Sequence, residues 1–171
     1  MGVYGRSPWA GLQVLFTTLM VVGIYRPAQA QKDACNLVAG DELQTALGVK
    51  VSGLKPQAIP GKPAQICMGQ TPTATVMLRL AKRSPNAPGH EVAGLEMARK
   101  MGAQVEVKPD GPITCSTMIP PVNLEQYGFN TTCSVFKNGQ VAAIEVTAKS
   151  RANMVSTDVL HRIVQKMADR M

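Results

Sequence analysis

The chain has 171 residues, of which 4% are aromatic, and carries a formal net charge of +7 at pH 7. This length suits one domain of ordinary size. The low aromatic content argues against a nucleic-acid platform built from stacked rings, and the basic residues are scattered rather than gathered into runs of like charge.

The first thirty residues differ in composition from the rest of the chain. They contain two arginines, no acidic residue and an apolar run over 12–25. Ala28 and Ala30 form the small-x-small pattern that precedes a signal-peptidase cleavage site, and the apolar run is shorter than the ~20 residues of a membrane-spanning helix. The sequence therefore predicts a signal peptide over 1–30 that is cleaved on export. The remaining domain, 31–171, is expected to be periplasmic or secreted and to have no membrane span.

Periodicity and turn residues predict the elements of the first half. Apolar residues at helical spacing that end in Gly48 indicate a helix, because glycine takes the left-handed C-cap conformation without strain. Alternation of apolar and polar residues indicates strands, whereas prolines disfavour regular structure because they lack the backbone donor. The predicted elements are a helix over 36–48, a strand over 49–52, a loop over 53–65, a strand that starts at 66–68 and a strand over 74–81.

The second half contains the clearer signals. Asn138-Gly139 is a strong hairpin turn because both positions accept a positive φ. An apolar stripe at helical spacing marks the last helix. The predicted elements are a loop over 82–89, a helix over 90–101, strands over 103–108 and 113–119, an irregular segment over 122–129, strands over 131–136 and 141–148, and a helix from about 155 to 170.

These elements predict an α+β fold. Consecutive strands joined by tight turns pair antiparallel, and helices packed on such a sheet define the class. We expect a sheet of about six to seven strands with three helices. The order helix, strand, cysteine-bearing strand, strand occurs twice, around Cys67 and Cys133, which suggests an internal repeat with an insertion around Cys115 in the second copy. Chance similarity between β-hairpin residues is the alternative explanation.

Four cysteines, Cys35, Cys67, Cys115 and Cys133, follow the predicted signal peptide. In an oxidising compartment they are expected to form disulfides. Three pairings are possible; the repeat favours Cys35–Cys67 with Cys115–Cys133 and leaves the other two open. No C-x-x-C motif supports a redox centre, and no pair has zinc-ligand spacing.

Catalytic signals are weak in this sequence. His90 and His161 are the only histidines, and there is no nucleophile elbow, phosphate loop or H-E-x-x-H motif. We therefore predict no enzymatic activity and no cofactor. Met97 and Met101 lie one helical turn apart, downstream of His90, and thioether ligands in an exported protein suggest copper(I). Methionines at this spacing are more often core residues.

The start of the predicted mature chain resembles that of small secreted proteins and lipoproteins of actinobacteria. The resemblance rests on 34–38 (Ala-Cys-Asn-Leu-Val), on Glu42-Leu43 and Leu47-Gly48, and on the later Cys67. A similar cysteine-bearing layout occurs in extracellular sensor domains. The resemblance implies an α+β fold of this kind and no particular reaction. The chain lacks a lipid-attachment box before Cys35, so we expect no lipid anchor.

The sequence therefore predicts an exported, non-enzymatic binding domain at the cell envelope. Without the signal peptide, 16 basic residues (18 − 2) and 11 acidic residues give 16 − 11 = +5, a charge that suits an anionic cell-surface component or an acidic envelope protein. The alternative is a small periplasmic hydrolase or a copper carrier that uses His90 or His161. Nucleic acid is not expected as a partner. The candidate contact residues are Arg79, Lys82, Arg83, Lys149 and Arg151.

Overall fold

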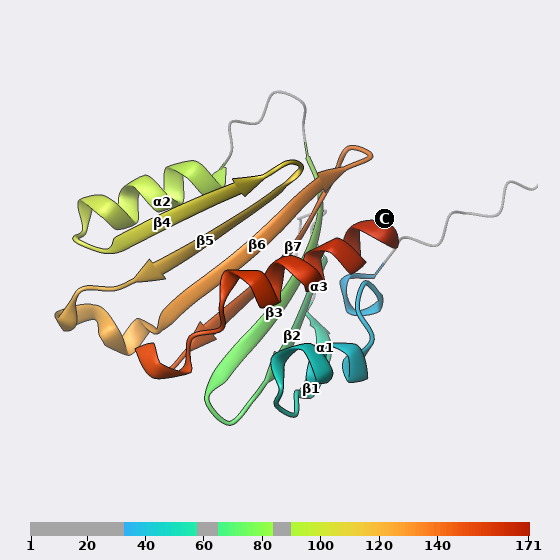
Figure 1. Cartoon of the computed structure of the whole chain (residues 1–171), viewed down its shortest axis with the longest axis horizontal. Helices are drawn as coiled ribbons and strands as arrows, with labels where there is room; N and C mark the ends of the chain where they lie inside the picture. Colours follow the sequence, from blue (N-terminus) through green and yellow to red (C-terminus); the bar gives the residue numbers. More distant parts are fainter. Residues whose placement is uncertain (1–32, 58–64, 84–89) are drawn as a thin grey trace, which may run out of the picture. The chain divides into compact units, whose positions relative to one another are not determined.

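A computed structural model describes residues 33–57, 65–83 and 90–171 of the chain (Figure 1). The predicted signal peptide lies outside these residues, and Gln31–Met171 forms one compact unit. Seven strands make an antiparallel sheet in the order β1-β2-β3-β7-β6-β5-β4, which confirms the α+β class. The strands are β1 (Ser52–Gln57), β2 (Gln65–Gln70), β3 (Ala74–Lys82), β4 (Gln104–Asp110), β5 (Ile113–Ile119), β6 (Phe129–Lys137) and β7 (Gln140–Ala148). The helices are α1 (Gly40–Leu47), α2 (His90–Lys100) and α3 (Thr157–Asp169), with the short 3-10 helices η1 (Ala34–Asn36), η2 (Val122–Tyr127) and η3 (Arg151–Asn153).

The hydrophobic core lies between the sheet and the layer formed by η1, α1 and α3 (Figure 1). Helix α3 packs over β5, β6 and β7, whereas η1 packs over β1, β2 and β3. The apolar stripe expected for the last helix is buried as predicted, because its residues face the sheet: Leu160, Ile163, Val164 and Met167. The hydroxyl of the fully buried Thr131 donates to the Val155 carbonyl at 2.9 Å and ties β6 to the segment that leads into α3.

Two related hairpins form the centre of the sheet. Leu78 of β3 pairs with Ile144 of β7, while Cys67 pairs with Leu78 and Cys133 pairs with Ile144. Cys67 and Cys133 are thus equivalent about an approximate two-fold axis between β3 and β7. Rotation about this axis relates β1 to β5, and it leaves β4 as the strand without a counterpart. The predicted insertion around Cys115 does not fit this symmetry, because β5, which carries Cys115, has a counterpart.

Both predicted disulfides are confirmed. Cys35–Cys67 links η1 to β2 across 32 residues of sequence, and Cys115–Cys133 links two directly opposed positions of β5 and β6. Asp33 accepts a hydrogen bond from the Cys35 backbone N–H at 2.9 Å and caps η1. Each half of the sheet therefore carries one disulfide: one joins β2 to η1, and the other joins β6 to β5.

The structure corrects the predicted boundaries near the first helix. Residues 34–36 form η1, so α1 begins at Gly40 rather than at 36. Strand β1 occupies residues 52–57, so the strand predicted over 49–52 is displaced: residues 49–51 are not in a strand, whereas 53–57, predicted as loop, are, although they include Pro56. An edge strand tolerates proline, and β1 pairs only with β2, with an irregular register between Ser52 and Lys55. The other predicted loop residues, 58–64 and 84–89, lie outside the described part.

Helix α2 lies beside β4 at the far edge of the sheet (Figure 1). The Arg99 guanidinium donates to the Val105 carbonyl at 3.3 Å. One carbonyl of the edge strand β4 is therefore already hydrogen-bonded to a side chain of α2. Exposed backbone groups on an edge strand invite pairing with other chains. The irregular pairing of β1 and the contact of α2 with β4 make both edges poor templates for strand addition.

Candidate functional site

The five predicted contact residues do not form one surface. In the antiparallel pair β3–β7, Lys82 lies opposite Gln140 and Ala74 lies opposite Ala148. Lys82 and Arg83 therefore lie at one end of the sheet, whereas Lys149 and Arg151, which follow β7, lie at the other. Arg79 is on β3, opposite Ala143 and three residue pairs further from this end of the sheet than Lys82.

At the first of these ends, basic side chains surround the turn between β6 and β7. Lys82 and Lys137 both pair with Gln140, and the Arg83 backbone N–H donates to the Gly139 carbonyl at 3.0 Å. The Arg83 guanidinium lies 5.3 Å from the ring centroid of Phe136, which is 47% exposed. We call Arg79, Lys82, Arg83, Lys137 and Phe136 the hairpin-tip cluster.

The hairpin tip presents these side chains from an ordered backbone. Asn138 and Gly139 have φ values of 52° and 72°, which are the positive angles predicted for this turn. The Lys137 ammonium donates to the Ala168 carbonyl at 2.6 Å and caps the C-terminal end of α3, where a positive charge is favoured. Lys82 and Arg83 remain exposed to solvent, so two cations and an aromatic ring are available to a ligand.

Phe136 and Lys137 were not among the residues predicted from the sequence. Phe136 is one of the few aromatic residues of the chain, and it occurs directly before a hairpin turn. That position could have suggested an exposed ring. Its contact with Arg83 joins residues far apart in the sequence, so only the pairing of β3 with β7 and of β7 with β6 brings the two side chains together.

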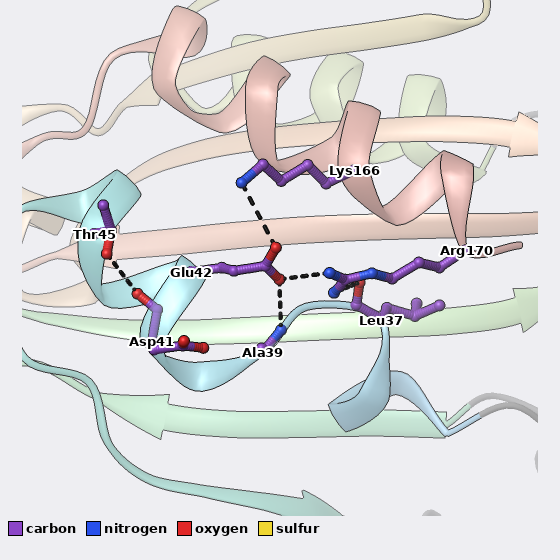
Figure 2. Close-up of polar contacts among 7 residues, drawn as sticks. All are labelled: Leu37, Ala39, Asp41, Glu42, Thr45, Lys166 and Arg170. Atoms are coloured by element: carbon purple, nitrogen blue, oxygen red, sulfur yellow. Dashed lines mark hydrogen bonds and ion pairs between the residues drawn. The ribbon is translucent and has the colours of Figure 1, made fainter.

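A second feature is the junction between α1 and α3, where Glu42 is the central residue (Figure 2). Its Oε2 accepts hydrogen bonds from the Ala39 backbone N–H at 3.1 Å and from the Arg170 guanidinium at 2.7 Å. Its Oε1 lies 3.6 Å from the Lys166 ammonium. The Ala39 hydrogen bond, followed by the Arg170 contact, lowers the pKa of Glu42 below its ordinary value. Arg170 also donates to the Leu37 carbonyl at 3.0 Å.

Glu42 borders a groove of about 270 Å³ between the two helices. Val38, Ala46 and Ile163 are its apolar residues, and Arg162 and Lys166 form its basic side. Both carboxylate oxygens of Glu42 are already engaged, so the residue joins the N-terminal segment to the last helix and is poorly suited to proton transfer. We therefore assign this junction a structural role.

The residues considered for hydrolysis or metal binding are dispersed. His161 forms a 3.1 Å contact with Asp110, which is at the end of β4, and it lies outside the α1–α3 groove. The side chain of His90 lies outside the described part. Met97 and Met101 are 61% and 58% exposed, so the explanation that they are core residues is wrong. Within the described ranges, no three or more His, Cys, Asp or Glu side chains are grouped as metal ligands.

Comparison with protein families and with curated proteins gave no significant match for this chain. Among the described residues, no helix combines the length and the apolar character needed to cross a bilayer.

Proposed function

We propose that the protein is an exported, non-enzymatic binding domain of the cell envelope that holds an acidic partner on the hairpin-tip cluster. The observation that carries this proposal is the joint exposure of Lys82, Arg83 and Phe136 on a well-defined turn. The export pattern of the sequence and the two disulfides support the location, because disulfides persist in oxidising compartments.

The cluster suits carboxylate or phosphate groups for two reasons. A guanidinium group offers a planar fork of donors that matches either anion in a bidentate geometry. The Phe136 ring attracts the Arg83 cation and restricts its motion, while Arg83 remains exposed to solvent. The partner is therefore an acidic envelope protein or an anionic surface polymer. Polyglutamate and a soluble polyphosphate distinguish the two chemistries.

The test measures the affinity of residues 31–171 for each polyanion by titration calorimetry at low salt. Lys82→Ala with Arg83→Ala should weaken binding at least tenfold. Lys50→Ala with Lys55→Ala removes the same charge elsewhere and should weaken it far less. Equal losses in the two double variants would mean that net charge alone attracts polyanions, and the proposal would fail. Phe136→Leu keeps every charge, and weaker binding by this variant would show that the ring contributes.

A copper(I) carrier is the second candidate, and the exposure of Met97 and Met101 favours it. Thioethers are soft ligands that select copper(I), and both side chains are accessible on α2. Copper(I) titration in competition with a chelator should show binding tighter than micromolar. Met97→Leu with Met101→Leu should abolish it. Weaker binding by the unsubstituted domain would exclude this function.

A further inference from the structure

Four exposed apolar side chains lie along the border of the sheet at the end opposite the hairpin-tip cluster, from beside β1 at one edge to beside β4 at the other. Val49 precedes β1, Met101 precedes β4, and Val122 and Tyr127 lie in η2 between β5 and β6. Their exposures are 40%, 58%, 85% and 74%. We call these four residues the apolar end. Exposed apolar residues scattered singly need no explanation, whereas a row of them along one border of a sheet, three of the four beside β4, β5 and β6, is a candidate interaction surface.

Backbone contacts show that the parts of this end adjoin one another. A Cβ atom placed on Gly102 would lie 3.9 Å from Pro121, so the chain that follows α2 adjoins the chain that precedes η2. Gly128, the residue that follows η2, packs closely against Thr147 at the end of β7, which places the junction of η2 and β6 beside that strand. Figure 1 shows the end of α2, η2 and the turn between β2 and β3 along the same border of the sheet.

A groove of about 300 Å³ opens at the same border. Residues from the end of α1, the β2–β3 turn and the segment before α3 line it. Its apolar side chains include Leu47, Val49, Met154, Val155 and Val159. The surface therefore combines protruding apolar groups with a recess of the size of a short hydrocarbon segment.

Basic residues accompany these apolar groups. Lys50, Lys100, Lys149 and Arg151 are all exposed at this end, together with the acidic residues Glu125 of η2 and Asp158 in the first turn of α3. The Lys149 ammonium donates to the Pro72 carbonyl at 3.1 Å, which fixes its position without neutralising its charge. Apolar side chains flanked by cations have the chemistry of a surface that binds an anionic lipid bilayer.

We propose that the apolar end docks the domain on a bilayer of anionic phospholipids, a contact separate from the binding of an acidic partner at the hairpin tip. Val122 and Tyr127 enter the interfacial layer, where a tyrosine ring has an apolar body and a polar tip at the correct depth. Lys100, Lys149 and Arg151 contact the headgroup phosphates. The hairpin-tip cluster then faces away from the membrane.

The test uses residues 31–171, which form a compact unit, because the apolar run of the leader would itself bind lipid. The only tryptophan of the chain is Trp9, so Val122→Trp gives this domain a single fluorescent reporter at η2. Its emission should shift to the blue with phosphatidylglycerol vesicles and stay unchanged with phosphatidylcholine vesicles. Brominated lipid should quench the shifted emission.

Vesicle co-sedimentation supplies the affinities. Val122→Asp with Tyr127→Ser should lower partitioning at least tenfold, and both positions are exposed enough to leave folding intact. Lys100→Ala with Arg151→Ala should lower it by about fivefold for each cation removed. Lys82→Ala with Arg83→Ala, at the opposite end, should have little effect.

Three results would overturn the proposal. One is an absence of binding to anionic vesicles at low salt. Another is an equal loss of binding in the hairpin-tip variant, which would indicate attraction by overall charge. The third is a concentration-dependent dimer that Val122→Asp dissociates, which would identify a second copy of the chain as the occupant. None of these results depends on polyanion binding, so this proposal and the proposed function can fail separately.

Discussion

Gly128 offers a direct test of how η2 is held against the sheet. It joins η2 to β6 with φ 89° and ψ 168°. A Cβ atom at this position would lie 2.5 Å from Thr147 Cγ2 and 3.0 Å from the Ala148 carbonyl oxygen. Both contacts belong to β7, which is hydrogen-bonded on both sides, so the neighbouring backbone has little freedom to move away. We expect Gly128→Ala to be strongly destabilising.

The expected loss has two parts. A backbone conformation that is accessible almost only to glycine costs an alanine about 1–3 kcal/mol. Overpacking against atoms that relax poorly adds about 1–3 kcal/mol. The free energy of unfolding should therefore fall by about 2–6 kcal/mol, a large share of the roughly 5–15 kcal/mol typical of a domain.

Gly48→Ala is the matched control for this substitution. Gly48 has φ 68° and ψ 10° at the end of α1, and no atom lies within 4 Å of its built Cβ position. The left-handed backbone conformation is then the only source of destabilisation, and it should lower the free energy of unfolding by about 1–2 kcal/mol. Urea unfolding of the oxidised domain, followed by circular dichroism, gives both values. If the two variants lose the same stability, crowding against β7 is not what requires glycine at position 128.

Three further predictions concern the contacts that hold the helical layer together and join it to the sheet. Replacing both Cys35 and Cys67 by alanine should lower the free energy of unfolding by about 3–4 kcal/mol, because the bridge closes a separation of 32 residues; an unchanged urea midpoint would contradict this. Thr131→Val should cost about 1–3 kcal/mol by leaving the partly buried Val155 carbonyl without its 2.9 Å partner, and an equally stable variant would show that another donor replaces it. Glu42 has a pKa below its ordinary value of 4.5, so its stabilisation is present above about pH 4.5 and is lost as pH falls through the lower folded-state pKa. Glu42→Gln should consequently be less stable than the unsubstituted domain at pH 7, and this difference should shrink on acidification; a difference independent of pH would refute the assigned ion pairs.

The disulfide pattern could be predicted because the suggested repeat gives Cys67 and Cys133 equivalent positions. Cys67 and Cys133 precede similar strands, and the sheet places them symmetrically about the central pair β3–β7. The position of the insertion could not be predicted in this way. Strands β4 and β5 have similar local patterns, and only the sheet order shows that β5 is the counterpart of β1.

The candidate surfaces could be predicted less well from the sequence. The cations chosen from the sequence include Lys82 and Lys149, which an antiparallel sheet places at opposite ends. Met97 and Met101 have the spacing of a buried helical stripe, yet α2 lies beside the edge strand β4 and leaves both side chains exposed. Burial therefore depended on where the helix docks, which its own periodicity does not specify.

The sequence alone determined the features that arise between residues close in the chain: the alternation of the central strands, the Asn138-Gly139 turn, the apolar stripe of α3 and the spacing of the cysteines. The tertiary structure decided what lies side by side across the sheet. It allowed Pro56 into a strand because β1 is an edge, and it brought Arg83 over Phe136. It also joined Glu42 to Arg170. The physical reason is that local propensity acts over a few residues, whereas a surface is assembled by strand order and helix packing between segments far apart in the chain.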